Sequence, residues 1–217
     1  MDRMLKIRHH CKVAEAPTTF DSYNNALRNS QERIANMQLT HLAKVLISSK
    51  AKAEQLTPKA EPGIYAWFLC NTALIPLLAA DVDKPIYIGR AVELSKRTLR
   101  QHLESGRTCS STLRRSLGAL LKGKDQLDLT ASHRGDGKNN NDYTNFLFSD
   151  AGEDRLTAWM HENLRLGICA AQDYISAEHQ TISVFHPPLN LMGWENPLRK
   201  EIKALRKICA DEARCRR

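Results

Sequence analysis

The sequence predicts an α+β protein in which a small central sheet of about three strands is flanked by helices. Two short apolar runs rich in β-forming residues, 63–69 and 85–89, have the length of strands. Longer segments before and after them carry apolar residues at helical spacing. The order of these elements shows neither the regular βαβ alternation of an α/β protein nor an internal repeat. These observations favour one mixed domain with helical extensions.

The first element is a long helix. From Asp21 to about Ala53 the chain contains no Pro or Gly. Two prolines within residues 55–62 must end the helix, since Pro cannot donate in the helical ladder. We therefore expect an N-terminal helical extension over residues 1–61. Its apolar stripe consists of Ala35, Leu39, Leu42, Ala43 and Leu46.

The two predicted strands are followed by an insertion of about residues 106–150. Before it, Ser95 is expected to cap a helix that runs to about Glu104. Within it, Ser110 or Ser111 is expected to cap a helix through Leu121. The runs 127–131 and 143–148 flank the polar loop RGDGKNNN and predict a hairpin.

The remaining elements are three helices and a strand. A helix begins at Asp150, with an apolar side made of Leu156, Trp159, Met160 and Leu164. The run 166–171 predicts the third core strand, and Ser176 is expected to cap a short helix that ends before Pro187. A final amphipathic helix occupies the C-terminal segment, residues 193–217. Its stripe is Leu198, Ile202, Leu205 and Ile208.

The net charge of +8 and the pI of about 9.3 suggest a polyanionic partner. Residues 199–217 hold eight basic residues against three acidic ones, which also fits an ordinary solvated helix face. The Ser111–Ser116 segment carries two adjacent arginines. They either bind phosphates or belong to an ordinary helix cap with a solvated turn. The cations that we expect to contact nucleic acid are Arg100, Arg114, Arg115, Lys200, Lys203, Arg206 and Lys207.

No segment has the length and apolarity of a membrane span or a signal peptide, so we expect a cytoplasmic protein without membrane partners. The six cysteines form no CxxC pair and are expected to be reduced thiols. The cluster of His9, His10 and Cys11 is not expected to bind a metal.

Two triplets carry the functional information, Gly63-Ile64-Tyr65 and Tyr87-Ile88-Gly89. They lie in this order on two predicted strands, and the chain thereby resembles the GIY-YIG nucleases. The likeness continues in Arg97, ten residues after Tyr87, and in a later helix that carries Glu178 and is followed by Pro and Asn190. It covers about residues 62–192, the expected catalytic domain, and departs from the family in the long insertion and in Leu189.

The resemblance implies a Mg²⁺-dependent endonuclease that hydrolyses phosphodiester bonds in DNA. Glu178 would bind Mg²⁺ or Mn²⁺, since a lone carboxylate suits an ion that keeps most of its waters. Arg97 would bridge phosphate oxygens, and Tyr65 would act as general base only with a lowered pKa, or else orient the water. Tyr87 would orient water or contact phosphate, and no Ser, Cys or His is an evident nucleophile. Gly63 and Gly89 would allow close backbone approach, and Asn190 would tie the Glu178 segment to the site.

The family histidine is displaced by one residue, because many members have it four residues after the arginine. Here Gln101 occupies that position and the histidine is His102. On a regular helix His102 would lie about 140° from Arg97, outside the site. We expect the regular helix; the alternative is a one-residue bulge after Arg97 that would turn His102 into the site as a catalytic residue.

A second interpretation is a nucleic-acid-binding module that keeps the fold and has lost useful catalysis. The displaced His102 and the long insertion motivate it. Restriction or anti-phage defence, DNA repair and mobile-element activity are all compatible with the sequence. The sequence does not determine the DNA target, whether RNA is also cleaved, or the oligomeric state, for which a homodimer is one option.

Overall fold

The computed structural model describes residues 28–29, 37, 39–78, 81–123 and 127–216. The chain forms two compact units, Met1–Gln38 and Leu39–Arg217, and every element discussed below belongs to the second unit. Most of the predicted N-terminal helix lies outside the described residues. Its described final part is a helix over residues 39–48. It ends before the predicted Ala53, because Ala51 forms a β-bridge to the sheet at Leu166.

In the described part of this unit, short helices lie between five strands. None of the helices in the described part of the chain is both long and apolar enough to cross a bilayer. The elements are η1 (Ala53–Gln55), β1 (Gly63–Leu69), η2 (Thr72–Leu74), η3 (Pro76–Leu78), β2 (Tyr87–Ala91), η4 (Lys96–Arg100), α2 (Gln101–Leu103), η5 (Thr108–Ser110), α3 (Thr112–Gly123), β3 (Ala131–Ser132), α4 (Asn140–Thr144), β4 (Leu147–Phe148), α5 (Asp150–Asn163), β5 (Leu164–Ala170), α6 (Tyr174–Phe185) and α7 (Arg199–Cys215).

The central sheet has three antiparallel strands in the order β2-β1-β5. In the register, Tyr65 of β1 pairs with Gly89 of β2 on one side and with Ile168 of β5 on the other. This confirms the predicted α+β class and the small sheet. The third strand begins at Leu164, slightly earlier than the predicted 166, directly after helix α5.

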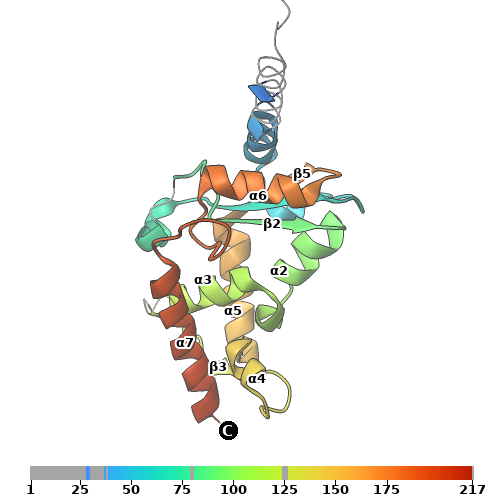
Figure 1. The fold of residues 1–217 in the computed structure, drawn as a ribbon. Helices are drawn as coiled ribbons and strands as arrows, with labels where there is room; N and C mark the ends of the chain where they lie inside the picture. Colours follow the sequence, from blue (N-terminus) through green and yellow to red (C-terminus); the bar gives the residue numbers. More distant parts are fainter. Residues whose placement is uncertain (1–27, 30–36, 38, 79–80, 124–126, 217) are drawn as a thin grey trace, which may run out of the picture. The chain divides into compact units, whose positions relative to one another are not determined.

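Every residue of β1 is buried, because helices cover both faces of the sheet. Tyr65 and Trp67 face the larger apolar cluster, which includes residues of α2, α3, α5 and α7. Ile64 and Phe68 face a smaller cluster that includes α6 and the helix over residues 39–48. Figure 1 shows α6 on one side of the sheet and α3 and α5 on the other. The uninterrupted apolar run of β1 follows from this two-sided burial.

The insertion contains the predicted hairpin with one difference. β3 pairs antiparallel with β4, as expected. The segment around Tyr143, predicted as strand, forms the helix α4 instead. Asn139 and Asp142 form a capping box at its start, which stabilises a helix where the sequence had suggested an extended chain.

The C-terminal helix α7 packs against α3 and β3 (Figure 1). Its buried residues are Ile202, Cys209, Ala210 and Ala213. The predicted stripe was therefore wrong at Ile208, whose side chain is exposed. The buried face is built largely from small residues, which give a weaker signal than the large aliphatic ones that suggested the stripe.

Two of the predicted helix caps differ from the structure. Ser95 has helical backbone angles and no capping bond; its hydroxyl donates to Glu93 instead. Helix α6 is capped by Asp173, whose side chain accepts a hydrogen bond from the amide of Ser176. The predicted cap of α3 is confirmed for Ser111, which accepts a hydrogen bond from a backbone amide one turn later.

Candidate active site

The two motif tyrosines lie on adjacent strands and face the same side of the sheet. Their ring centroids are 6.4 Å apart. The Tyr65 ring lies across Gly89, where an added Cβ would collide with the Tyr65 hydroxyl. A Cβ on Gly63 would collide with the carbonyl oxygen of Cys169 on β5. Both motif glycines therefore permit a close approach, as expected from the sequence.

The helix after β2 contains a π-helical turn, η4, between residues with α-helical geometry. Hydrogen bonds in a π turn join residues five positions apart rather than four. His102, five positions after Arg97, is therefore turned toward the site. The prediction of a regular helix was wrong, and the bulge is the arrangement that the structure contains. His102 is completely buried among Tyr65, Trp67 and Tyr87.

His102 connects Tyr65 to Ser111 through its two ring nitrogens. Nε2 lies 2.8 Å from the Tyr65 hydroxyl oxygen, and Nδ1 lies 2.8 Å from Oγ of Ser111. If Nδ1 carries the hydrogen, it donates to Ser111 and Nε2 accepts from Tyr65. In the other tautomer both bonds reverse, because the serine and tyrosine hydroxyls can each donate or accept. The chain of three groups can therefore carry a proton either way.

The imidazole of His102 and the phenol of Tyr65 are both neutral in the protein alone. Burial lowers the pKa of His102 from 6.5 to about 3, and the positive charges of Arg97 and Arg114 act in the same direction. Burial, together with Tyr87, raises the pKa of Tyr65 above its usual value, while Arg97 opposes this shift. In the protein alone, the proton therefore stays on Tyr65 and does not pass to His102.

The insertion also contacts the second motif tyrosine. The hydroxyl oxygen of Tyr87 lies 3.2 Å from Oγ1 of Thr112, the first residue of α3. Ser111, which caps the same helix, bonds His102. Two consecutive hydroxyl side chains at the start of α3 thus position His102 and Tyr87.

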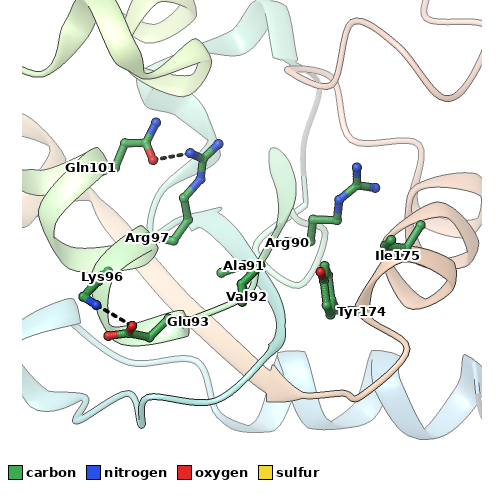
Figure 2. A pocket seen from close by; sticks show the side chains of 9 residues that line it. All are labelled: Arg90, Ala91, Val92, Glu93, Lys96, Arg97, Gln101, Tyr174 and Ile175. Carbon is green, nitrogen blue, oxygen red and sulfur yellow. Dashed lines mark hydrogen bonds and ion pairs between the residues drawn. The ribbon is translucent and has the colours of Figure 1, made fainter.

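Arg97 lines a cavity of about 450 Å³ beside the end of β2. It donates through Nη1 to Gln101, and Gln101 donates to the carbonyl oxygen of Ser110 at 2.6 Å. Nε of Arg97 is buried without a hydrogen-bond partner. Figure 2 shows Arg97 and Arg90 extending from opposite sides of this cavity. Gln101 therefore positions Arg97 and ties it to the insertion.

Glu178 lies in the second turn of α6, because Asp173 rather than the predicted Ser176 caps the helix. Its Oε2 accepts a hydrogen bond of 2.6 Å from Nη1 of Arg90. Burial raises the pKa of Glu178, while the positive charges of its ion-pair partner Arg90 and of Arg97 counteract the shift. The carboxylate is thus ion-paired with Arg90, and the charge of Arg97 also acts on it.

Asn190 ties the segment after α6 to β2. Its Oδ1 accepts a hydrogen bond from the amide of Ile88 at 2.8 Å, and its Nδ2 donates to the carbonyl oxygen of Ile88 at 2.7 Å. The side chain thereby pairs with the edge strand much as another strand would. These bonds fit the tethering role expected for Asn190.

The predicted nucleic-acid contacts divide into buried and exposed cations. Arg114 was wrongly predicted: it is fully buried, forms an ion pair of 2.7 Å with Glu153 and donates to the carbonyl oxygen of His102. Arg115 and Arg206 are half-buried and donate to backbone carbonyl groups. The exposed members of the set are Arg100, Lys200, Lys203 and Lys207.

Sequence reasoning missed three supporting residues, Ser111 as a partner of His102, Gln101 as a partner of Arg97, and Arg90 as a partner of Glu178. The contact of Ser111 follows from how the insertion folds back on the helix, which no local pattern encodes. The four-residue spacing of Arg97 and Gln101 is a local signal that could have identified their contact. Arg90 directly follows the second triplet, and this position alone is a signal that could have identified it.

Glu178 is the residue best suited to hold a divalent metal. Within the described part of the chain, no group of three His, Cys, Asp or Glu side chains is arranged to bind a metal ion. Mg²⁺ is commonly held by one or two carboxylates and completes its shell with water and phosphate oxygens. The residues present therefore fit a metal that binds together with a phosphate, rather than a preformed protein cage.

Searches of curated proteins and of solved structures gave no match. The family model described as the GIY-YIG catalytic domain matches residues 63–208, which is more than half of the chain. The matched region runs from β1 into α7 and includes both motif strands, the helix with Arg97 and the helix with Glu178. With the motif geometry described above, this match shows that the chain belongs to the GIY-YIG nuclease superfamily.

Proposed function

We propose that this protein is a Mg²⁺-dependent endonuclease that hydrolyses phosphodiester bonds in DNA. The observation that carries the proposal is the hydrogen bond of 2.8 Å between Tyr65 and the neutral imidazole of His102, on the same helix as Arg97. A hydroxyl, a proton acceptor and a permanent cation are the groups that water attack on a phosphate diester requires.

The Tyr65 side chain is completely buried in the protein alone, so it would meet the attacking water only in the substrate complex. There it would accept a proton from the water, because its own proton has an acceptor. When Nδ1 of His102 carries the hydrogen, Nε2 accepts the hydrogen bond from Tyr65. As the water proton moves to the phenol oxygen, the phenol proton moves to Nε2. The phenol then need not ionise, which its raised pKa would oppose.

The resulting imidazolium would be unfavourable in the protein alone, since Arg97 and Arg114 already lower the pKa of His102. A DNA phosphate beside Arg97 would add negative charge and favour the protonated ring. Proton transfer is therefore expected to depend on bound substrate.

Arg97 is suited to bind the scissile phosphate. Its guanidinium stays charged and offers a planar fork of donors, and its Nε has no partner in the protein. Glu178 would hold the metal ion, which when bound supplies charge stabilisation to the phosphate and the leaving oxygen. Tyr87, held by Thr112, would orient the water or contact a phosphate oxygen.

DNA is the proposed substrate because the chain carries a net charge of +8 and three exposed lysines, Lys200, Lys203 and Lys207, follow one another along α7. The cytoplasm is the proposed location.

The rival interpretation, an inactive nucleic-acid-binding module, was motivated by the displaced histidine and by the insertion. Both features now favour activity. The π turn brings His102 to Tyr65, and the insertion supplies Ser111 to the same ring.

The test is to incubate plasmid, single-stranded and branched DNA with the protein and Mg²⁺ or Mn²⁺. Glu178→Gln removes the charge of the proposed metal ligand at nearly constant volume, and Glu195→Gln, at an exposed position, is its matched control. We expect the wild type and Glu195→Gln to cleave, and Glu178→Gln to bind DNA without cleaving it. DNA binding by the wild type without cleavage of any substrate would favour the rival.

A further inference from the structure

Arg90 connects the proposed metal ligand to the cavity in which DNA would bind. It lies on β2, an edge strand of the sheet, and is the exposed position of that strand. Its side chain is 40% exposed, and its Nη1 lies 2.6 Å from Oε2 of Glu178, which is 16% exposed. In the protein alone, the carboxylate that would bind the metal is therefore neutralised by a guanidinium.

This ion pair competes with a metal ion. A divalent cation at Glu178 must displace Arg90 or lie beside it, and a second permanent cation, Arg97, also acts on the carboxylate. Lys96 lines the same cavity as both arginines, but it is ion-paired with Glu93, which also lines the cavity, so the two arginines supply the excess positive charge. The positive charges of Arg90 and Arg97 repel a divalent cation at Glu178 and thereby weaken its binding. The DNA-free protein is therefore expected to bind divalent metals weakly at Glu178.

The cavity also offers Arg90 a different partner. Arg90 lines it together with the apolar side chains of Val92 and Ile175, both exposed, and with Tyr174. Figure 2 shows Arg90, Tyr174 and Ile175 on one side of the cavity and Arg97 on the other. Cations that bind phosphate, next to apolar surface that contacts sugar or base, suit a stretch of DNA backbone. A guanidinium pairs with a phosphate in the same bidentate way as with a carboxylate.

We propose that Arg90 couples metal binding to DNA binding: it occupies Glu178 in the DNA-free protein, and a backbone phosphate in the cavity draws it away so that the metal ion can bind Glu178. This inference rests on the proposed function, since it takes DNA as the substrate. Arg90 is a phosphate-binding and positioning residue in this scheme. Because DNA must first displace Arg90 from Glu178, the metal ion would bind only to protein that already holds DNA.

The test measures Mn²⁺ binding to the DNA-free protein from the electron paramagnetic resonance signal of the free ion. Arg90→Gln is expected to bind Mn²⁺ about tenfold more tightly than the wild type, because roughly one opposing charge–charge interaction is lost. Arg90→Lys should restore weak binding, and the double variant Arg90→Gln/Glu178→Gln should lose the gain. The matched control is Arg155→Gln, because Arg155 is an ion-paired arginine of similar exposure on α5.

A second measurement follows duplex binding in EDTA as a function of salt. Arg90→Gln should lower the slope of log affinity against log salt by about one, as expected for the loss of one phosphate contact. Arg90→Gln protein with the wild-type melting temperature and the wild-type Mn²⁺ affinity would overturn the proposal. An unchanged salt slope would overturn it as well.

Plasmid cleavage by the wild type separates this inference from the proposed function. If the wild type cleaves DNA and Arg90→Gln leaves Mn²⁺ affinity unchanged, the coupling is wrong and the nuclease assignment stands. If the wild type cleaves no DNA and Arg90→Gln still binds Mn²⁺ more tightly, the assignment fails and the masking of Glu178 by Arg90 stands.

Discussion

Tyr65 and His102, which lie 37 positions apart on a strand and a helix, share a buried hydrogen bond of 2.8 Å. Three features that are distant in the sequence make this contact. Gly89 leaves room for the Tyr65 ring, the π turn η4 rotates His102 toward it, and Ser111 holds the other side of the imidazole. Removing any of the three should disturb the same proton path.

The first prediction concerns His102→Asn. Asn can keep one hydrogen bond to Ser111 but offers Tyr65 no imidazole nitrogen. We expect cleavage to fall by about 10²–10⁴-fold, the range typical for the loss of a general acid–base group, while DNA binding is retained. His41→Asn, at an exposed position of the helix over residues 39–48, is the control. Wild-type cleavage by His102→Asn would remove His102 from the mechanism.

The second prediction concerns stability against pH. His102 has a pKa of about 3 in the folded protein and about 6.5 when unfolded. Between these values the unfolded chain binds a proton that the native protein does not, so the free energy of unfolding must fall as pH is lowered from about 6.5 toward 3. This residue contributes up to about 1.4 kcal/mol per pH unit. Above pH 6.5 its contribution is constant.

Urea unfolding at several pH values between 4.5 and 7 tests this. His102→Asn should show a shallower loss of stability over that range than the wild type, because the carboxylates titrate in both proteins and cancel in the comparison. Equal slopes in the two proteins would mean that His102 is protonated in the native state.

The third prediction concerns Gly89→Ala. The added methyl group would meet the hydroxyl end of the Tyr65 ring, which is packed in the core and cannot move without displacing His102. We expect a loss of about 1–3 kcal/mol in the free energy of unfolding, together with a large loss of cleavage. Met192→Ala, at a largely exposed side chain, should change stability by less than about 0.5 kcal/mol. A Gly89→Ala protein as stable and active as the wild type would contradict the close packing.

The sheet and its motif could be predicted because their signals are local. The run from Gly63 to Leu69 is apolar throughout, since both faces of β1 are covered, and its length is typical of a strand. The paired strands then place Tyr65 and Tyr87 on one face by register alone. A short apolar run, the two triplets and their order in the chain were sufficient for this part of the site.

The π turn could not be predicted, because the sequence around it is equally compatible with a regular helix. Contacts from the insertion accompany it: Gln101 donates to the carbonyl oxygen of Ser110, and Arg114 donates to that of His102. The same reasoning explains the error at Arg114. Two adjacent arginines are typical of a phosphate-binding site. Only the fold shows that one of them forms an ion pair with Glu153, a residue of α5.

The fourth prediction concerns the exposed lysines of α7. Deleting the helix would remove the buried Ile202 and Cys209 and test folding rather than DNA binding. The triple variant Lys200→Gln/Lys203→Gln/Lys207→Gln instead keeps the packed face. If all three lysines contact phosphates, the slope of log affinity against log salt should decrease by about 2.7. Lys59→Gln/Lys84→Gln/Lys138→Gln, at exposed positions elsewhere, removes the same three charges and controls for net charge. An unchanged slope would assign α7 to packing against α3 alone.

The last prediction tests the π turn itself. Deleting Thr98 shortens the segment between Arg97 and His102 by one residue, so that the histidine follows the arginine by four positions. On a regular α-helix, residues four apart lie on the same face, and the histidine should still reach Tyr65. Because the rest of the chain keeps its place, we expect the variant to fold, to keep cleavage within about tenfold of the wild type and to melt no lower, since the π turn is replaced by a better hydrogen-bonded helix.

The modest loss of activity in that variant would come from Gln101, which would then follow Arg97 by only three positions and lose its present geometry. Adding His102→Asn to the deletion should abolish cleavage and thereby show that the same ring acts in both proteins. A deletion variant that folds, binds DNA and fails to cleave would mean that the π turn serves catalysis in another way than by bringing His102 to Tyr65.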